Sequence, residues 1–311
     1  MAFEQARVLV QPKPWGVADL RPWSNLDRGT DLIGELSYER ADAAAPAAAL
    51  LLKLLFTSEP LSIQVHPDDA YARSIGLPNG KSEAWYVLHA APGAKVALGL
   101  NRTLTRNQLR SAIGDGSIAQ LVRWQAVKDH DIISVPAGTI HAIGAGLVIA
   151  EIQQRSEATF RLFDHGRNRG LHTADGAAAA RLGATGIQTQ PKQSSEQRLL
   201  LAANAYFVFE RIALEPDSCW LLDAVRETWL IAINGDAKAG PFDLAQGSAI
   251  FAQAEQVAIR AGGSGVDCLV AYTGSGGPTT HLLHPMKPQN TSRVVHSGSN
   301  KTQTPTIGMS P

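Results

Sequence analysis

The sequence predicts an all-β protein built from two strand-rich blocks, and three observations support this. Short runs rich in apolar, β-branched and aromatic residues recur over residues 7–153. Turns that contain glycine or proline, such as Pro136-Ala137-Gly138, separate these runs. A second series of strand-like segments extends over residues 206–272. Many short strands divided by turns favour an antiparallel sandwich or barrel over a βαβ sheet.

The elements of the first block follow from the apolar pattern. Strands are expected at residues 7–10, 32–38, 50–56, 61–66, 83–88, 95–98, 131–135, 140–143 and 147–153. A helical insertion interrupts them, because Thr105 is a suitable N-cap for a helix over 106–113, and a second short helix is expected over 117–124. The alanine-rich segment 174–182 predicts a further helix. In the second block, Asn234-Gly235-Asp236 predicts a hairpin turn after a strand over 228–233.

The composition and charge of the chain argue against a nucleic-acid partner, a membrane partner and secretion. Lys plus Arg equals Asp plus Glu at 28 each, so no global charge attracts nucleic acid or an anionic membrane. The longest apolar stretch, 43–55, contains Pro46 and Lys53 and is shorter than the roughly 18 residues of a membrane span. The N-terminus lacks the regions of a signal peptide. We therefore expect a cytoplasmic protein with no nucleic-acid or membrane partner. Cys219 and Cys268 each precede an apolar residue, which favours buried free thiols.

Four polar side chains on or beside predicted strands could bind a divalent metal. Gln64 and His66 share one face of their strand because side chains alternate with a period of two, and Glu83 and His141 belong to later strands. Two imidazoles, a carboxylate and an amide carbonyl would leave coordination positions free for water or substrate. A lone strand histidine is more often packed or solvated, and glutamine is an uncommon zinc ligand. The pattern therefore does not choose among zinc, manganese and iron.

A second group of charged residues could complete such a site. Glu151 would lie near His141 if the strands around Gly144-Ala145-Gly146 form a hairpin. Arg161 and Arg167 could bind a phosphate through their fork of donors, and Lys81 shares a strand face with Glu83. Each of these charges could equally lie in solvent on the residues alone.

Two polar segments suggest the domain boundaries. Residues 188–196 contain no apolar residue except proline and predict a linker. We expect a metal-binding domain over 1–190 with its helical insertion near 105–124. A second domain over 196–280 is expected to lack a metal site, since no histidine occurs between His172 and His281. Residues 285–311 are rich in Ser, Thr, Asn and Pro and predict a flexible tail.

The motifs of the first block resemble the type I mannose-6-phosphate isomerases, especially the short bacterial form. The segments that carry the resemblance are Lys13-Pro14-Trp15-Gly16, Gly34-Glu35, residues 62–69, residues 80–86, residues 136–143, residues 151–161 and Gly170-Leu171-His172. Two positions depart from the family pattern: Glu157 replaces the usual Asp, and His130 replaces a common glycine.

The resemblance implies a fold, a metal and a reaction. The family is built on cupin modules, which are jelly rolls or double-stranded β-helices, and the second block resembles its C-terminal cupin in layout. The family binds zinc, here one Zn²⁺ per chain, and interconverts mannose 6-phosphate and fructose 6-phosphate by proton transfer through an enediol(ate). By resemblance the metal ligands are Gln64, His66, Glu83 and His141, and the catalytic residues of the first domain are Lys81, Glu151 and Arg161.

The expected reaction leaves some roles and some alternatives open. Glu151 or Lys81 would be the base, and Arg161 would hold the phosphate or stabilise developing negative charge. One alternative is a metal-dependent cupin that acts on another sugar phosphate or on a free sugar. Another is a sugar-binding cupin without turnover. The presence of all three catalytic candidates favours an enzyme with a small sugar-phosphate substrate.

Overall fold

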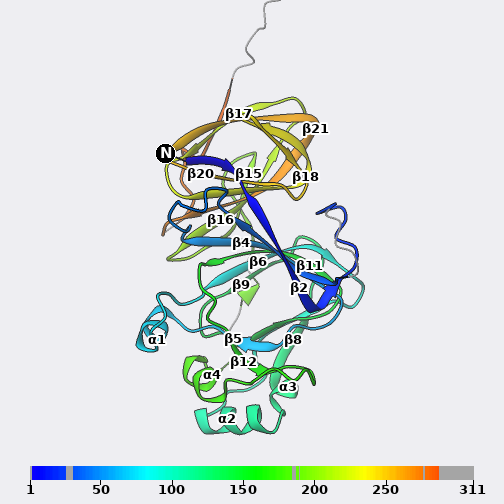
Figure 1. The fold of residues 1–311 in the computed structure, drawn as a ribbon, viewed down its shortest axis with the longest axis vertical. Coiled ribbons are helices and arrows are strands. Elements are labelled where there is room, and N and C mark those ends of the chain that lie inside the picture. The colour runs from blue at the N-terminus through cyan, green and yellow to red at the C-terminus, as the bar shows by residue number, and fades with distance from the viewer. Residues whose placement is uncertain (1, 26–30, 184–186, 189, 276, 287–311) are drawn as a thin grey trace, which may run out of the picture.

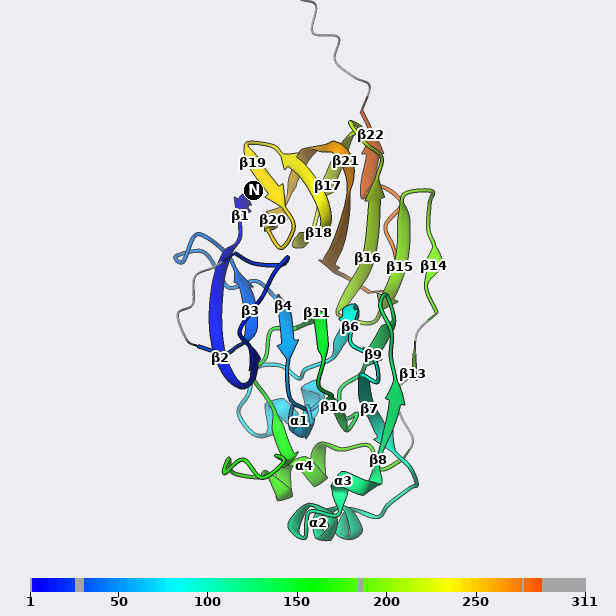
Figure 2. The same ribbon diagram turned by 90° about the vertical axis from the view of Figure 1, so that its right-hand side faces the viewer.

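The structure is a computed structural model that describes residues 2–25, 31–183, 187–188, 190–275 and 277–286. Three antiparallel sheets follow one another along the long axis of the molecule, and the helices gather at one end (Figures 1 and 2). Strands dominate the described residues, so the all-β prediction with a small helical insertion is confirmed.

The first block consists of two sheets that face each other. In spatial order, the seven-stranded sheet contains β13 (Ile187–Gln188), β9 (Ile132–Val135), β6 (Glu83–Ala90), β11 (Leu147–Gln154), β4 (Leu50–Thr57), β3 (Ile33–Glu39) and β2 (Arg7–Val17). The five-stranded sheet contains β12 (Phe160–Phe163), β5 (Ile63–Val65), β10 (His141–Ile143), β7 (Lys95–Leu100) and β8 (Val122–Ala126).

Strand β4 shows how the layers pack. It is an interior strand whose residues are all buried, which explains its nearly continuous apolar sequence. Leu55 belongs to a core that also contains Val96 of the five-stranded sheet. Leu54, on the opposite face, belongs to a core that also contains Trp229 of the second block. The seven-stranded sheet is therefore sandwiched between the five-stranded sheet and the second block.

The second block is built on one ten-stranded sheet that curls around its own core. Its strands are β1 (Ala2–Gln5), β14 (Lys192–Gln193), β15 (Arg198–Ala203), β16 (Phe207–Leu214), β17 (Cys219–Ala224), β18 (Thr228–Ala239), β19 (Phe242–Ala245), β20 (Ala249–Gln253), β21 (Glu255–Thr273) and β22 (Leu283–Pro285). Strand β1 pairs with β20, so the N-terminal residues lie in this sheet although the expected boundary put them in the first domain. The boundary near residue 190 remains a prediction.

Four short helices occur in the described part of the chain: α1 (Asp69–Ser74), α2 (Arg106–Gly114), α3 (Ile118–Leu121) and α4 (Thr173–Ala179). Thr105 and Gln108 form a capping box at α2, as expected of its N-cap. The predicted helix over 117–124 is too long, because the chain turns into β8 at Val122 and pairs with β7. Helices α2 and α4 pack on the outer face of the five-stranded sheet.

Two expectations for the second block were wrong in detail. The Asn234-Gly235 segment is not a hairpin turn, because β18 continues to Ala239 and pairs with β21 through a bulge at this point. Part of the expected linker forms β14, which pairs with β15. Both cysteines are free, but Cys219 is half-buried rather than buried. The expected flexible tail lies outside the described residues from 287 onward.

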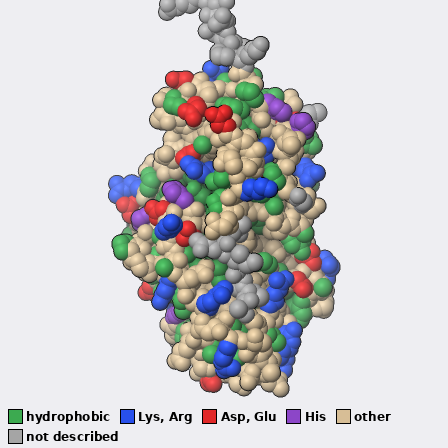
Figure 3. Space-filling model, turned by 180° about the vertical axis from the view of Figure 1, so that it is seen from behind, with side chains coloured by type: hydrophobic (Ala, Val, Ile, Leu, Met, Phe, Trp, Pro, Cys, Tyr) green, Lys and Arg blue, Asp and Glu red, His purple; other side chains and the backbone are tan. Residues whose placement is uncertain are grey.

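The surface matches the balanced charge of the sequence. Basic and acidic side chains are both scattered over the face in Figure 3. Among the described helices, none has the length and apolar character needed to cross a membrane.

Candidate metal centre and its cavity

The site lies where the two sheets of the first block face each other. On the five-stranded sheet, Gln64 of β5 stands opposite both Arg161 of β12 and His141 of β10, so these three form one cross-strand row. On the seven-stranded sheet, Glu151 of β11 stands between Lys53 of β4 and Trp85 of β6. Residues opposite each other on neighbouring antiparallel strands point to the same face. Each row therefore presents its polar side chains together.

The sequence-based argument for placing Glu151 near His141 was wrong, although the two residues serve the same site. Strands β10 and β11 do not form a hairpin: β10 pairs with β5 and β7, whereas β11 pairs with β4 and β6. The turn at 144–146 thus carries the chain from one sheet to the facing sheet. Glu151 reaches the site across the sandwich, not along a hairpin.

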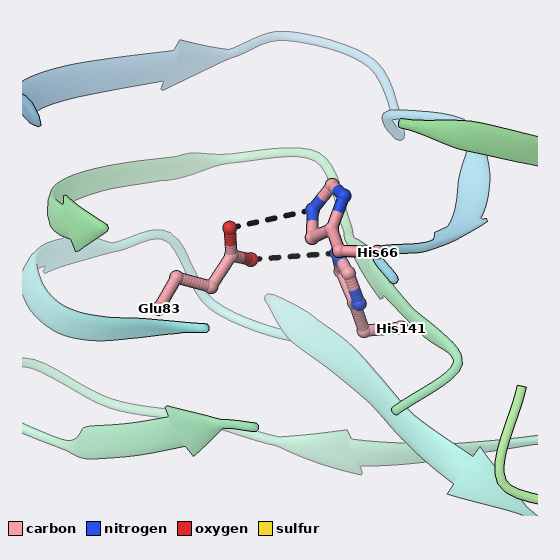
Figure 4. Close-up of side chains that lie close together, drawn as sticks. All are labelled: His66, Glu83 and His141. Atoms are coloured by element: carbon pink, nitrogen blue, oxygen red, sulfur yellow. Dashed lines mark ion pairs between the residues drawn. The ribbon is translucent and has the colours of Figure 1, made fainter. Parts of the chain in front are cut away.

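Three metal-ligating side chains converge in the interior (Figure 4). The Oε2 atom of Glu83 lies 3.3 Å from His66 Nε2, and its Oε1 atom lies 3.4 Å from His141 Nε2. One ligand atom from each residue lies within 4.8 Å of the others. All three side chains are almost completely buried. This is the spacing that a single ion requires from a shared set of ligands.

Main-chain carbonyls fix the tautomers of both imidazoles. His66 Nδ1 lies 2.8 Å from the carbonyl oxygen of Ala158, and His141 Nδ1 lies 2.9 Å from that of Thr139. A carbonyl can only accept, so each Nδ1 carries the proton and each Nε2 presents a lone pair. Burial lowers the pKa of His66 to about 3 and also lowers the pKa of His141, which keeps both rings neutral.

The resulting set of acceptors fits a divalent cation. Glu83 Oε1 and His66 Nε2 are buried and have no hydrogen-bond partner, whereas Glu83 Oε2 faces the Lys81 ammonium at 3.2 Å. Burial alone would raise the pKa of Glu83, but the Lys81 ammonium holds it well below its usual range. Unpaired buried acceptors are costly, and a metal ion would satisfy all of them at once. Nitrogen and carboxylate donors in this number suit zinc and its neighbours.

Gln64 can supply a fourth donor. Its Nε2 atom lies 3.2 Å from His141 Nε2, and its Oε1 atom accepts a hydrogen bond of 3.1 Å from Ser62 Oγ. Rotation of the amide by 180° exchanges these atoms and turns the oxygen toward the imidazole nitrogen. A metal-bound form needs that orientation.

Lys81 and Glu151 line the cavity beside the ligands and are both buried. Lys81 Nζ lies 3.2 Å from Glu83 Oε2. Burial works to lower the pKa of Lys81, but Glu83 and Glu151 outweigh it, so the pKa is raised and the ammonium form is favoured. Burial and the nearby Glu83 raise the pKa of Glu151 to about 7. Trp85 Nε1 donates a hydrogen bond of 3.0 Å to Glu151 Oε2 and so orients this carboxyl group.

The cavity is rich in cations, and they differ in their partners. Lys13 and Lys53 share one carboxylate, because Glu35 lies 3.2 Å from the first ammonium and 3.5 Å from the second. Arg169 donates two hydrogen bonds to Asp164. Arg161 Nη1 donates to the Gly170 carbonyl at 2.9 Å, and its buried Nε has no hydrogen-bond partner. Of the Lys and Arg side chains that line the cavity in the described residues, only Arg161 has no carboxylate within ion-pair distance.

All seven residues that the sequence suggested for the site lie together. His66, Glu83 and His141 cluster together, and Gln64, Lys81, Glu151 and Arg161 line the adjoining cavity. Sequence reasoning did not assign Lys53, Glu35 or Trp85 to the site, although all three line the cavity. Lys53 carried a signal, since it is a lone charge in the apolar run of β4. Arg167, a further phosphate candidate, is turned to Asp164 and Glu59 instead.

Comparisons with known proteins agree with this geometry. The chain is 42% identical over 129 residues to a mannose-6-phosphate isomerase of Streptococcus mutans, which covers 40% of each protein. It is 41% identical over 119 residues to the mannose-6-phosphate isomerase ManA of Bacillus subtilis, which covers 38% of each. The chain resembles mannose-6-phosphate isomerases. The matched regions thus span about two-fifths of the length of these curated relatives.

The whole fold has a counterpart among solved structures. The crystal structure of the mannose 6-phosphate isomerase from Bacillus subtilis superimposes with a TM-score of 0.74 at 23% identity. That match covers 86% of this chain and 98% of the other. At this identity it establishes the fold, including the second block. No family model matches the chain.

Proposed function

We propose that the chain is a zinc-dependent aldose-ketose isomerase that interconverts mannose 6-phosphate and fructose 6-phosphate. The observation that carries the proposal is the buried cluster of potential metal ligands on His66, Glu83 and His141, which lies beside a carboxyl group with a raised pKa and an arginine that has no carboxylate partner among the described residues. The two curated relatives described above, which match this chain over about two-fifths of its length, are named mannose-6-phosphate isomerases, and this likeness supports the proposal.

The metal would be held by the two histidines, Glu83 and the amide oxygen of Gln64. A divalent cation in this place supplies charge that polarises a carbonyl oxygen and favours loss of a proton from the neighbouring carbon. The protein adds a dry setting, because the ligands are buried between the sheets. Exclusion of bulk water strengthens the charge interactions made there.

Glu151 is the proposed base. Isomerisation needs a group that takes a proton from one carbon and returns it to the next, and such a group works best with a pKa near the working pH. The pKa of Glu151 is raised to about 7, whereas the pKa of Lys81 is raised further from neutrality. Lys81 would therefore act as a fixed positive charge. Trp85 holds Glu151 in one orientation through its indole N–H.

The cations of the cavity support a phosphorylated substrate. Lys13 and Lys53 have only the Glu35 carboxylate between them as an ion-pair partner in the described residues, which leaves a positive surplus at that end. Arg161 stands beside Gln64 in the cross-strand row and is free to bind an oxyanion at the metal end. An open-chain sugar phosphate has negative charge at one end and develops it at the other during proton transfer.

A coupled assay with mannose 6-phosphate tests the proposal, with metal analysis of the purified chain and with and without chelator. The expected result is bound zinc, isomerisation, and loss of activity on chelation that zinc restores. Metal binding without turnover would indicate a sugar-binding protein instead. If the chain converts another sugar phosphate, or a free sugar, but not mannose 6-phosphate, the proposed substrate is wrong and the converted sugar takes its place.

A further inference from the structure

One carboxylate joins the chain segments that carry two of the metal ligands. Asp69 lies three residues after His66, at the start of α1. Its Oδ1 atom accepts a hydrogen bond of 2.8 Å from the N–H of Gly80, three residues before Glu83. The contact is tight, because a Cβ on Gly80 would lie 2.5 Å from the Asp68 carbonyl carbon. Asp69 thus ties the end of the His66 strand to the start of the Glu83 strand.

The same carboxylate also reaches the strand that carries Glu151. Gln154 at the end of β11 donates a hydrogen bond of 3.1 Å from Nε2 to Asp69 Oδ1. Its Oε1 atom accepts a hydrogen bond of 2.9 Å from the N–H of Ser82. Ser82 lies between Lys81 and Glu83 in the sequence, so the Gln154 amide fixes the main chain between these two site residues. Asp69 orients that amide.

A tyrosine of the second block contacts this cluster. Tyr206, which directly precedes β16, donates a hydrogen bond of 3.3 Å from its hydroxyl to Asp69 Oδ2. The other carboxylate oxygen serves Gly80 and Gln154. Asp69 is therefore shared between the segments around the metal ligands and the second block.

We propose that Asp69 is a positioning residue that sets the geometry of the metal centre, and that Tyr206 couples this geometry to the second β-rich block. The proposal rests on the metal centre of the proposed function but not on its isomerase reaction. Residues that orient metal ligands without touching the metal commonly change metal affinity about 10- to 100-fold when they are replaced. This gives the second block a role at the metal centre of the first.

Cobalt titration of the full-length protein tests the proposal, because the visible absorption of bound Co²⁺ reports ligand geometry independently of turnover. Asp69→Ala is expected to weaken Co²⁺ binding about 10-fold or more and to alter the spectrum. Asp69→Asn should recover most of both, since its amide oxygen can still accept from Gly80. Tyr206→Phe should give a smaller loss of about fivefold. In the Asp69→Ala background it should add nothing, because its effect passes through the carboxylate.

Asp68→Ala is the matched control. Asp68 lies closer to His66 in the sequence and caps α1 by accepting a hydrogen bond of 2.8 Å from the N–H of Tyr71. The control thus disturbs the same helix, but its side chain makes its hydrogen bond within that helix and not to the Glu83 segment, so it should leave affinity and spectrum unchanged. Equal losses in Asp68→Ala and Asp69→Ala, or no loss in Asp69→Ala, would overturn the proposal.

The readouts separate this proposal from the proposed function. A wild-type chain that shows the expected cobalt responses but no isomerisation of mannose 6-phosphate refutes the proposed function alone. An active chain whose Asp69 variants keep the wild-type cobalt spectrum and affinity refutes the positioning role alone. A chain that binds no Co²⁺ refutes the metal centre and the positioning role with it.

Discussion

Replacement of Arg161 separates the role of this residue in turnover from any role in folding. Arg161→Ala should lower kcat for mannose 6-phosphate about 10²- to 10³-fold, the usual cost of one lost donor to a developing oxyanion. The guanidinium stands beside Gln64 at the metal end of the cavity and has no carboxylate partner among the described residues. Its positive charge is therefore available to the substrate.

The structural cost of the same change is small. The side chain donates one hydrogen bond, to the exposed Gly170 carbonyl. Loss of such a bond costs about 0.5–1.5 kcal/mol of folding free energy. For a chain of this size that corresponds to a fall in Tm of about 1–2 °C. The main chain of Arg161 keeps its hydrogen bonds to the His172 imidazole and from the His172 N–H, so β12 should keep its place.

The assay measures kcat and KM beside metal content and thermal unfolding of the same preparations. Arg161→Lys is the matched variant, because it keeps the charge but loses the fork of donors, and it should recover part of kcat. Near-normal turnover in Arg161→Ala, with metal and Tm unchanged, would refute the assignment. A rise in KM with an unchanged kcat would show instead that Arg161 binds the substrate and the transition state equally well.

Four further predictions follow from the same geometry. Saturating zinc, at 100 times its Kd, should stabilise the protein by about 2.7 kcal/mol, and a chelator that leaves Tm unchanged would contradict the metal centre. The rate should rise with pH as Glu151 loses its proton, around its pKa of about 7. A bound cation favours the carboxylate form and would move this rise to lower pH. A rate that does not change between about pH 5 and 8 would exclude Glu151 as the base. Glu227→Ala should lower the free energy of unfolding, measured in urea, by about 2–4 kcal/mol. The reason is that Glu227 accepts hydrogen bonds of 2.6 and 2.8 Å from the N–H groups of residues 49 and 50 and so joins the two blocks. A loss below about 0.5 kcal/mol would show that the junction does not depend on Glu227. In a Cys219→Ser background, a thiol reagent should label the protein only after unfolding, because Cys268 is buried and burial raises its pKa; rapid labelling of the native protein would contradict its placement.

Local patterns in the sequence were enough to predict much of the site. The two-residue spacing of Gln64 and His66, and of Lys81 and Glu83, predicted that the members of each pair point the same way, and the structure has both pairs in contact with the same centre. His66 and Lys81 lie just outside the strands, because β5 ends at Val65 and β6 begins at Glu83. Alternation is a property of the strand itself and does not depend on its neighbours. The same holds for the N-cap at Thr105, which needs only the next three residues.

Other features depend on which strands become neighbours. The hairpin expected around residues 144–146 does not form, and the Asn234-Gly235 pair lies in a bulge rather than a turn, because in both places pairing with distant strands prevails over the local turn signal. Lys53 looks like an interruption of an apolar strand until β4 pairs with β11 and puts it beside Glu151.

The sequence by itself determined the strand content, the face on which each polar side chain of a strand lies, and the candidate ligands, because these follow from a period of two residues and from side-chain chemistry. The tertiary structure decided that the two rows face each other across a sandwich, that Glu151 meets the centre from the opposite sheet, and that Tyr206 of the second block reaches Asp69. These contacts join residues far apart in the chain, and they arise only when burial of the apolar faces brings the three sheets together.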